Sequence, residues 1–253
     1  MIITVANQKG GVGKTTTTIN TAASIALKGK KVLIVDADPQ GNATTGVGID
    51  KKAVENTVYD VISGDISAKD AVIKKDSLYI ISSSIDLAGA EIELVSRKSR
   101  EAVLKKALSE IKDDYDYIFI DAPPSLGLIT INALVAADLV LVPIQTEYYA
   151  MEGLSQLINT INLVKKSLNK KIELEGVVLT MYDSRTNLSV QVADEVRMYF
   201  GGKVHDTVIP RNVRLGEAPS YGMPITEYDP KCAGAEAYMA LADEVIARCE
   251  SRK

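Results

Sequence analysis

The residues with the clearest chemistry lie in Lys9–Thr16, which follows directly on the apolar run Ile2–Ala6. This order places a buried strand before a glycine-rich loop and a helix start. The glycines let backbone N–H groups converge on phosphate oxygens, Lys14 adds a mobile charge, and the Thr15 hydroxyl can reach Mg²⁺. We therefore predict that this loop binds nucleotide phosphates through Lys9, Gly10, Gly11, Val12, Gly13, Lys14, Thr15 and Thr16.

The loop departs from the common phosphate-binding pattern at its start. That pattern has a glycine five places before Gly13, where this chain has Gln8. The next residue, Lys9, adds a second positive charge to the loop. The spacing therefore predicts a deviant form of the nucleotide-binding loop.

Aspartates end two apolar runs, with Asp36 and Asp38 after 32–35 and Asp121 after 117–120. In open α/β sheets the carboxyl ends of the strands border the ligand crevice, and carboxylates there commonly hold Mg²⁺. Taken alone, each aspartate would be interpreted as a turn or cap residue. Together with the phosphate loop, they predict a magnesium site formed by Thr15, Asp38 and Asp121.

Apolar runs alternate with helical segments, which predicts a P-loop NTPase-like α/β fold with a mostly parallel, twisted sheet and helices on both faces. The expected strands are Ile2–Ala6, Lys31–Asp36, Leu78–Ile81, Tyr117–Asp121, Leu139–Pro143, Glu175–Thr180 and Lys203–Ile209. The expected helices are Lys14–Lys28, Ile85–Glu110, Leu126–Ala137, Met151–Leu168, Leu188–Phe200 and Ala233–Arg248. Asp50–Ser77 is the least regular stretch and is expected to be an excursion from the sheet. We find no repeat or linker that would divide the chain, so residues 1–253 are predicted to form a single domain.

The charge balance is 29 basic against 33 acidic residues, a net charge of −4. This argues against a protein coated in positive charge for nucleic acid, although a local basic patch remains possible. Cys232 and Cys249 would lie about 25 Å apart on one helix, too far for a disulfide, and two thiols without a framework fit a cytoplasmic protein. Leu128–Ile144 is interrupted by polar residues, so we expect no membrane span. The single histidine, His205, is expected to be structural or exposed.

Three motifs together carry a family resemblance: the loop Lys9–Thr16, Asp36–Thr44 (DADPQGNAT) and Asp121–Gly127 (DAPPSLG). In this order they resemble the ParA/Soj family of chromosome and plasmid partitioning ATPases. The similarity extends through 147–157, 180–188 and 208–225, and covers essentially the whole chain. The chain is most similar to the short, Soj-like type, which lacks an N-terminal DNA-reading extension.

The resemblance implies ATP and Mg²⁺ as ligands and a catalytic set of Lys9, Lys14, Asp38 and Asp121. Lys14 matches the phosphate-binding lysine, and Lys9 the lysine that reaches the partner subunit's nucleotide. Asp38 matches the aspartate that orients the attacking water, and Asp121 the second aspartate near the metal. Three further positions match segments that border the adenine in relatives: Met181, Pro210 and Asn212.

Arg185 and Arg214 match arginines that relatives use to contact DNA without regard to sequence. Without the resemblance they would be interpreted as solvated surface charges, and Arg211 stays open between these two interpretations. The resemblance further implies a homodimer in the ATP state that binds double-stranded DNA and is nucleoid-associated. It also implies slow ATP hydrolysis stimulated by a ParB/Spo0J-like partner.

Two other classes of protein share a similar fold. A MinD-like membrane-associated positioning ATPase would end in a basic amphipathic helix. Residues 242–253 contain three acids and no bulky aromatic, so we expect no membrane binding. A metallocluster reductase would need cysteines near the nucleotide loops. Cys232 and Cys249 lie far downstream of those loops, so this class ranks last.

Overall fold

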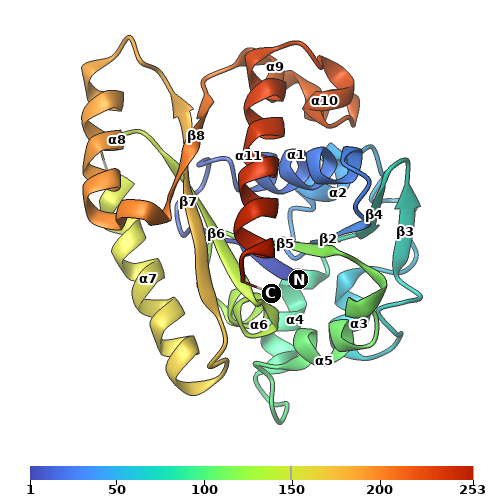
Figure 1. Ribbon diagram of the computed structural model, residues 1–253. Helices are drawn as coiled ribbons and strands as arrows, with labels where there is room; N and C mark the ends of the chain where they lie inside the picture. The colour runs from blue at the N-terminus through green and yellow to red at the C-terminus, as the bar shows by residue number, and fades with distance from the viewer. Residues whose placement is uncertain (149, 253) are drawn as a thin grey trace.

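The computed structural model describes residues 1–148 and 150–252 and contains one eight-stranded sheet (Figure 1). The strands are β1 (Ile2–Val5), β2 (Val32–Asp36), β3 (Val72–Lys75), β4 (Leu78–Ile81), β5 (Tyr117–Asp121), β6 (Leu139–Gln145), β7 (Glu173–Tyr182) and β8 (Val204–Pro210). Their order across the sheet is β3-β4-β2-β5-β1-β6-β7-β8, and every pairing is parallel except β3 with β4. The predicted mostly parallel sheet is confirmed.

Helices cover both faces of the sheet, as the alternation of the sequence predicts (Figure 1). In β5, Ile118 and Ile120 point into one core, while Tyr117 and Phe119 point into the other. The first core is closed by α3 (Val58–Ser63), α4 (Leu87–Leu94), α5 (Val103–Ser109), α6 (Leu128–Ala136), α7 (Ala150–Ser167) and α8 (Asn187–Phe200). The second core is closed by α1 (Lys14–Leu27), α2 (Asn42–Gly46), α9 (Val213–Glu217), α10 (Ile225–Tyr228) and α11 (Ala233–Glu250). The almost complete burial of the central strands β1, β2, β5 and β6 explains why these strands are apolar without alternation.

The prediction of one helix over Ile85–Glu110 is wrong, because the segment forms α4 and α5 with a break between them. Within the break, Ser99 has a left-handed backbone with φ +54°. Asn132 of α6 stabilises the restart: its Oδ1 accepts a hydrogen bond from the backbone N–H of Leu104 (3.2 Å), and its Nδ2 donates to the carbonyl of Arg100 (2.7 Å). A distant side chain therefore fixes where the second helix begins, which periodicity in the segment itself does not reveal.

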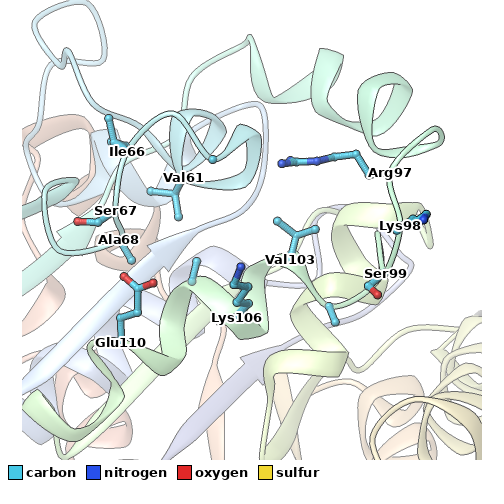
Figure 2. A pocket seen from close by; sticks show the side chains of 13 residues that line it. Val61, Ile66, Ser67, Ala68, Arg97, Lys98, Ser99, Val103, Lys106 and Glu110 are labelled. Atoms are coloured by element: carbon cyan, nitrogen blue, oxygen red, sulfur yellow. The ribbon is translucent and has the colours of Figure 1, made fainter.

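The break lines a cavity of about 550 Å³ between α3 and α5 (Figure 2). Figure 2 shows Arg97 reaching across it, and the Arg97 guanidinium donates to the carbonyl of Ile62 (2.5 Å). None of the residues predicted for the nucleotide or DNA sites lines this cavity. Cavity size alone therefore does not locate the site that the sequence predicts.

The expectation that Asp50–Ser77 leaves the sheet is only partly correct. The stretch contains α3, but its end forms β3, which adds an antiparallel edge to the sheet through a hairpin with β4. The hairpin turns at Asp76, whose φ of +50° suits an aspartate better than most residues. β3 was not predicted because Val72–Lys75 is short and half polar. It is also incompletely buried, as edge strands commonly are.

The single histidine is structural, as expected. His205 on β8 is buried, and its ring nitrogens lie 2.8 Å from Glu175 on β7 and 2.8 Å from Glu244 on α11. Glu244 also accepts hydrogen bonds from the backbone N–H groups of Asp206 (3.0 Å) and Thr207 (2.8 Å). This cluster fastens the last helix to the edge of the sheet.

We expect Glu244→Ala to lower the free energy of unfolding by about 2–4 kcal/mol, because several donors would lose one acceptor together. Burial acts to raise the pKa of Glu244, but hydrogen bonds from Thr207 and His205 lower it below the usual value. The contribution should be complete above the ordinary glutamate pKa of about 4.3 and be lost as the pH falls through the lowered value. Urea unfolding measures the effect. The control is Asp243→Ala, which removes only an exposed ion pair with Lys28. An equal loss in both variants would contradict this role for Glu244.

Candidate functional site

The glycine-rich loop connects the end of β1 to the first residue of α1. Gly11 and Gly13 have left-handed backbones with φ of +76° and +86°, which glycine adopts without strain. A Cβ atom added at Gly10 or Gly11 would meet no atom within 4 Å, so the space beside the loop is open. On its other side the loop is held to β7, because the Thr180 hydroxyl donates to the carbonyl of Val12 (2.8 Å). The loop is thus a supported cradle with room for a ligand.

Lys14 lies inside this cradle with only 7% of its surface exposed. Its Nζ donates to the carbonyl of Lys9 (3.2 Å). Burial lowers the pKa of Lys14, and the nearby carboxylates of Asp121 and Asp38 oppose that change. An ammonium group with so little water around it is suited to an anionic ligand such as a triphosphate.

Two fully buried aspartates lie side by side, because Asp36 of β2 pairs in register with Asp121 of β5. Oδ2 of Asp121 accepts a hydrogen bond from the Thr15 hydroxyl (2.7 Å), and Oδ2 of Asp36 accepts one from the Thr44 hydroxyl (2.7 Å). Burial raises the pKa of Asp36 to about 6, and burial together with the charge of Asp36 raises the pKa of Asp121 to about 7. A divalent cation beside Thr15 would relieve this crowding of acidic groups, so the residues present fit Mg²⁺.

Asp36 is a residue that the predicted metal set omits. Its place at the end of an apolar strand was visible in the sequence, but its register with Asp121 was not. Within residues 1–148 and 150–252, no three His, Cys, Asp or Glu side chains form a group that could hold a metal by themselves. A magnesium ion here would therefore be completed by Thr15, phosphate oxygens and water, which is its usual preference.

Asp38 lies two residues beyond the end of β2 and is 8% exposed. Its Oδ1 accepts a hydrogen bond from the backbone N–H of Gln40 (2.9 Å), which restricts the side chain. Its charge acts on Lys14 and on Asp121, so the carboxylate lies close to both. The structure therefore places Asp38 beside the phosphate cradle.

Lys9 forms an ion pair with Glu147, which lies just after β6 in the same chain. Glu147 is a second residue that was not singled out from the sequence. Both side chains are about one-third exposed, so the pair lies at the rim of the cradle. A role for Lys9 across a dimer would require it to exchange this carboxylate for another anion.

The three positions assigned to the adenine line one cavity of about 340 Å³, together with Gly13 and Thr16 of the loop. They are Met181, Pro210 and Asn212. Met181 has φ +52°, an unusual backbone for methionine and a form of strain that often marks ligand sites. The buried ring of Tyr238 also lines the cavity, another contributor missed from the sequence. The apolar walls and the shared glycine suit a flat base joined to phosphates in the cradle.

Arg185 lies in the segment after β7, and Arg214 lies in α9 after β8; the carboxyl ends of both strands line this cavity. Their side chains are 86% and 53% exposed. Arg211 directly follows β8; its backbone N–H donates to the carbonyl of Tyr182 (3.0 Å), and its charge acts on Asp183. All three arginines thus lie in exposed segments that follow β7 and β8, the two strands whose ends also line the base cavity.

Comparisons with known proteins agree with this geometry. The family model described as an AAA domain matches residues 1–174. The chain is 59% identical over 249 residues to the sporulation initiation inhibitor protein Soj of Bacillus subtilis (strain 168), covering 97% of this chain and 98% of Soj. It is 52% identical over 256 residues to the chromosome partitioning protein ParA of Caulobacter vibrioides (strain NA1000 / CB15N), covering 100% and 96%.

A solved structure with the same fold is cobyrinic acid a,c-diamide synthase from Mycobacterium smegmatis with bound ADP and magnesium. It has a TM-score of 0.88 and 38% identity, and the match covers 100% of this chain and 96% of that one. Its name denotes another activity, but the partitioning proteins are considerably more similar in sequence. The chain therefore belongs to the ParA/Soj family of chromosome-partitioning ATPases.

Proposed function

We propose that this protein is an ATP-driven partitioning switch that binds Mg-ATP, dimerises, and then binds DNA without sequence preference. The observation that carries the proposal is the buried Lys14 in an open glycine cradle, next to the hydrogen-bonded pair of Thr15 and Asp121. These groups supply what a magnesium triphosphate requires, and the family is one of ATPases. We treat residues 1–253 as one ATPase domain, because a single sheet runs through the chain.

In this proposal, different residues of the chain bind the phosphates, the base, the metal ion and the attacking water. Lys14 and the loop N–H groups bind the phosphates, while Met181, Pro210 and Asn212 enclose the base. Thr15 and the aspartates at the ends of β2 and β5 would hold Mg²⁺, which supplies positive charge at the phosphates when bound. Asp38 orients the attacking water. We propose that turnover is slow until a ParB/Spo0J-like protein binds.

Lys9→Ala should leave ATP binding nearly intact but prevent ATP-dependent dimerisation. In the proposed dimer Lys9 contacts the partner subunit's nucleotide, so its charge contributes only when two subunits meet. Light scattering in ATP measures the dimer, and titration with a fluorescent ATP analogue measures binding. Glu147→Gln is the matched control, because it frees Lys9 from its ion pair and should not weaken dimerisation. Normal dimerisation of Lys9→Ala would remove this role.

Arg185→Glu should abolish DNA binding while leaving ATP binding and dimerisation unchanged. A chain of net charge −4 has no overall attraction for DNA, so a few local contacts must provide it. A dimer doubles those contacts on one surface, which raises the effective concentration of the second set. A gel-shift series in ATP, with several duplex sequences and salt concentrations, tests the proposal. Sequence-independent, salt-sensitive binding that is lost in Arg185→Glu is expected, whereas unchanged binding by this variant contradicts it.

The packing of the last helix, α11, favours the partitioning function over the MinD-like alternative. The apolar side of α11, including Tyr238, Leu241 and Val245, is buried in the core against the sheet and α1. It would have to leave the core to enter a lipid surface. Among the described residues, no helix has the length and apolar character needed to cross a bilayer. We propose a cytoplasmic, nucleoid-associated location rather than a membrane one.

A further inference from the structure

Each arginine proposed to contact DNA is already paired with a carboxylate. Arg185 forms a two-pronged contact with Asp183, in which Nε donates to Oδ1 (2.8 Å) and Nη2 donates to Oδ2 (2.7 Å). Arg214 Nη1 donates to Glu217 (2.8 Å), and its Nε lies 3.4 Å from Asp229. A planar guanidinium uses the same fork to bind a carboxylate or a phosphate. The arginines therefore hold acids in the positions that phosphates would occupy.

The acids cancel the charge of this surface. Arg185 contacts Asp183, which Arg211 also faces, and Arg214 contacts Glu217 and Asp229. The positive charge of these arginines is therefore offset locally by the acids beside them. Such a surface attracts a polyanion weakly until the arginines change partners.

Protonation does not free the arginines near neutral pH. Hydrogen bonds from Arg185 lower the pKa of Asp183 to about 2, and those from Arg214 and Tyr228 lower the pKa of Glu217. Both acids stay ionised, so release of the arginines requires another anion. A DNA phosphate is such an anion, and it can reach the arginines because their side chains, 86% and 53% exposed, are open to water.

We propose that Asp183 and Glu217 compete with DNA phosphates for Arg185 and Arg214 and thereby limit the DNA affinity of each subunit. The inference rests on the DNA binding proposed above. A single subunit gains little by exchanging acids for phosphates. A dimer exchanges acids for phosphates at twice as many arginines at once. DNA binding therefore depends more steeply on dimerisation than it would if the arginines had no acidic partners.

Isosteric variants test the competition without disturbing the fold. Asp183→Asn keeps the Oδ1 that accepts the Arg185 backbone N–H (3.0 Å), and Glu217→Gln keeps an oxygen for the Tyr228 hydroxyl (3.1 Å). Asp206→Asn is the matched control. It makes the same change in net charge at an exposed position near the start of β8, at the opposite end of that strand from Arg211.

Fluorescence anisotropy of a short labelled duplex, at fixed salt and with ATP, measures DNA affinity for each variant. Because each substitution occurs twice in the dimer, Asp183→Asn and Glu217→Gln should each raise affinity by about 2- to 30-fold. The double variant should also bind measurably without nucleotide, and Asp206→Asn should stay near wild type. In the Asp183→Asn background, Arg185→Ala should remove the gain from Asp183→Asn, which would show that the gain acts through that arginine. Light scattering should report wild-type dimerisation throughout.

The outcomes separate this inference from the function on which it rests. If wild type binds DNA in ATP but the two isosteric variants gain no more than Asp206→Asn, the acids act only through long-range charge and the inference is overturned. A gain in Asp183→Asn that survives Arg185→Ala, or that follows increased dimerisation, overturns it as well. If neither wild type nor any variant binds DNA in ATP, the proposed function fails and the inference fails with it.

Discussion

Replacing Lys14 with alanine is expected to weaken Mg-ATP binding by about 10- to 100-fold and to abolish the dimerisation that depends on it. Lys14 and Lys9 are the two cationic residues of the loop, and Lys9 is already paired with Glu147. Lys14 is buried within the cradle, where its charge is poorly hydrated and interacts strongly with phosphates. Backbone N–H groups alone cannot replace a full positive charge.

Thermal unfolding with and without Mg-ATP provides a second measurement for this variant. A ligand that binds only the folded state stabilises it by about 2.7 kcal/mol at a hundred times its dissociation constant. Wild type should therefore show a clear rise in unfolding temperature with Mg-ATP. A 10- to 100-fold weaker affinity would leave Lys14→Ala only about 0.4–1.4 kcal/mol of stabilisation at the same concentration, and so a much smaller rise. Lys31→Ala is the control, because Lys31 lies over the rings of Tyr79 and Tyr115 rather than at the loop. A Lys14→Ala protein that binds a fluorescent ATP analogue like wild type would contradict the assignment.

Asp38→Ala is expected to bind Mg-ATP and dimerise, but to hydrolyse ATP about 10²- to 10⁴-fold more slowly. A carboxylate that orients water stabilises the transition state far more than the bound ground state. The hydrogen bond from the Gln40 N–H and the low exposure of Asp38 keep its side chain in a narrow range of positions. The variant should therefore accumulate as a persistent ATP dimer.

Phosphate release and light scattering, recorded on the same sample, measure both consequences of Asp38→Ala. Asp38→Asn serves as the conservative control, because its amide oxygen can still accept the Gln40 N–H. If Asp38 acts on water, the asparagine variant should be as slow as the alanine variant. Wild-type turnover in Asp38→Asn would show that the residue only shapes the loop after β2.

The parts of the site that depend on local order were predictable from the sequence. The phosphate loop, Asp38 and Asp121 each follow an apolar strand, and parallel strands bring those ends to one edge of the sheet. What could not be predicted depends on contacts between distant segments. Asn132 of α6 fixes the start of α5 within the segment predicted as one helix, and the register of β2 with β5 places Asp36 against Asp121.

The base cavity shows a different limit of sequence reasoning. Met181, Pro210 and Asn212 lie far along the chain from Gly13, and none of these residue types is required by the chemistry of an adenine. Only the family resemblance placed them together, and the structure has them around one cavity with the loop. The acids beside Lys9, Arg185 and Arg214 were likewise not predicted, because the role of a surface carboxylate depends on the side chain that it contacts.

The most direct test of the central claim is co-sedimentation of the wild-type protein with plasmid DNA and with liposomes, each in ATP, ADP and no nucleotide. The claim is that ATP converts a protein with little affinity for DNA into one that binds it. We expect the protein to sediment with DNA in ATP only, to be released by added salt, and to stay unbound with liposomes in every nucleotide state. Equal sedimentation with DNA in all three states, or ATP-dependent sedimentation with liposomes instead of DNA, would contradict the account.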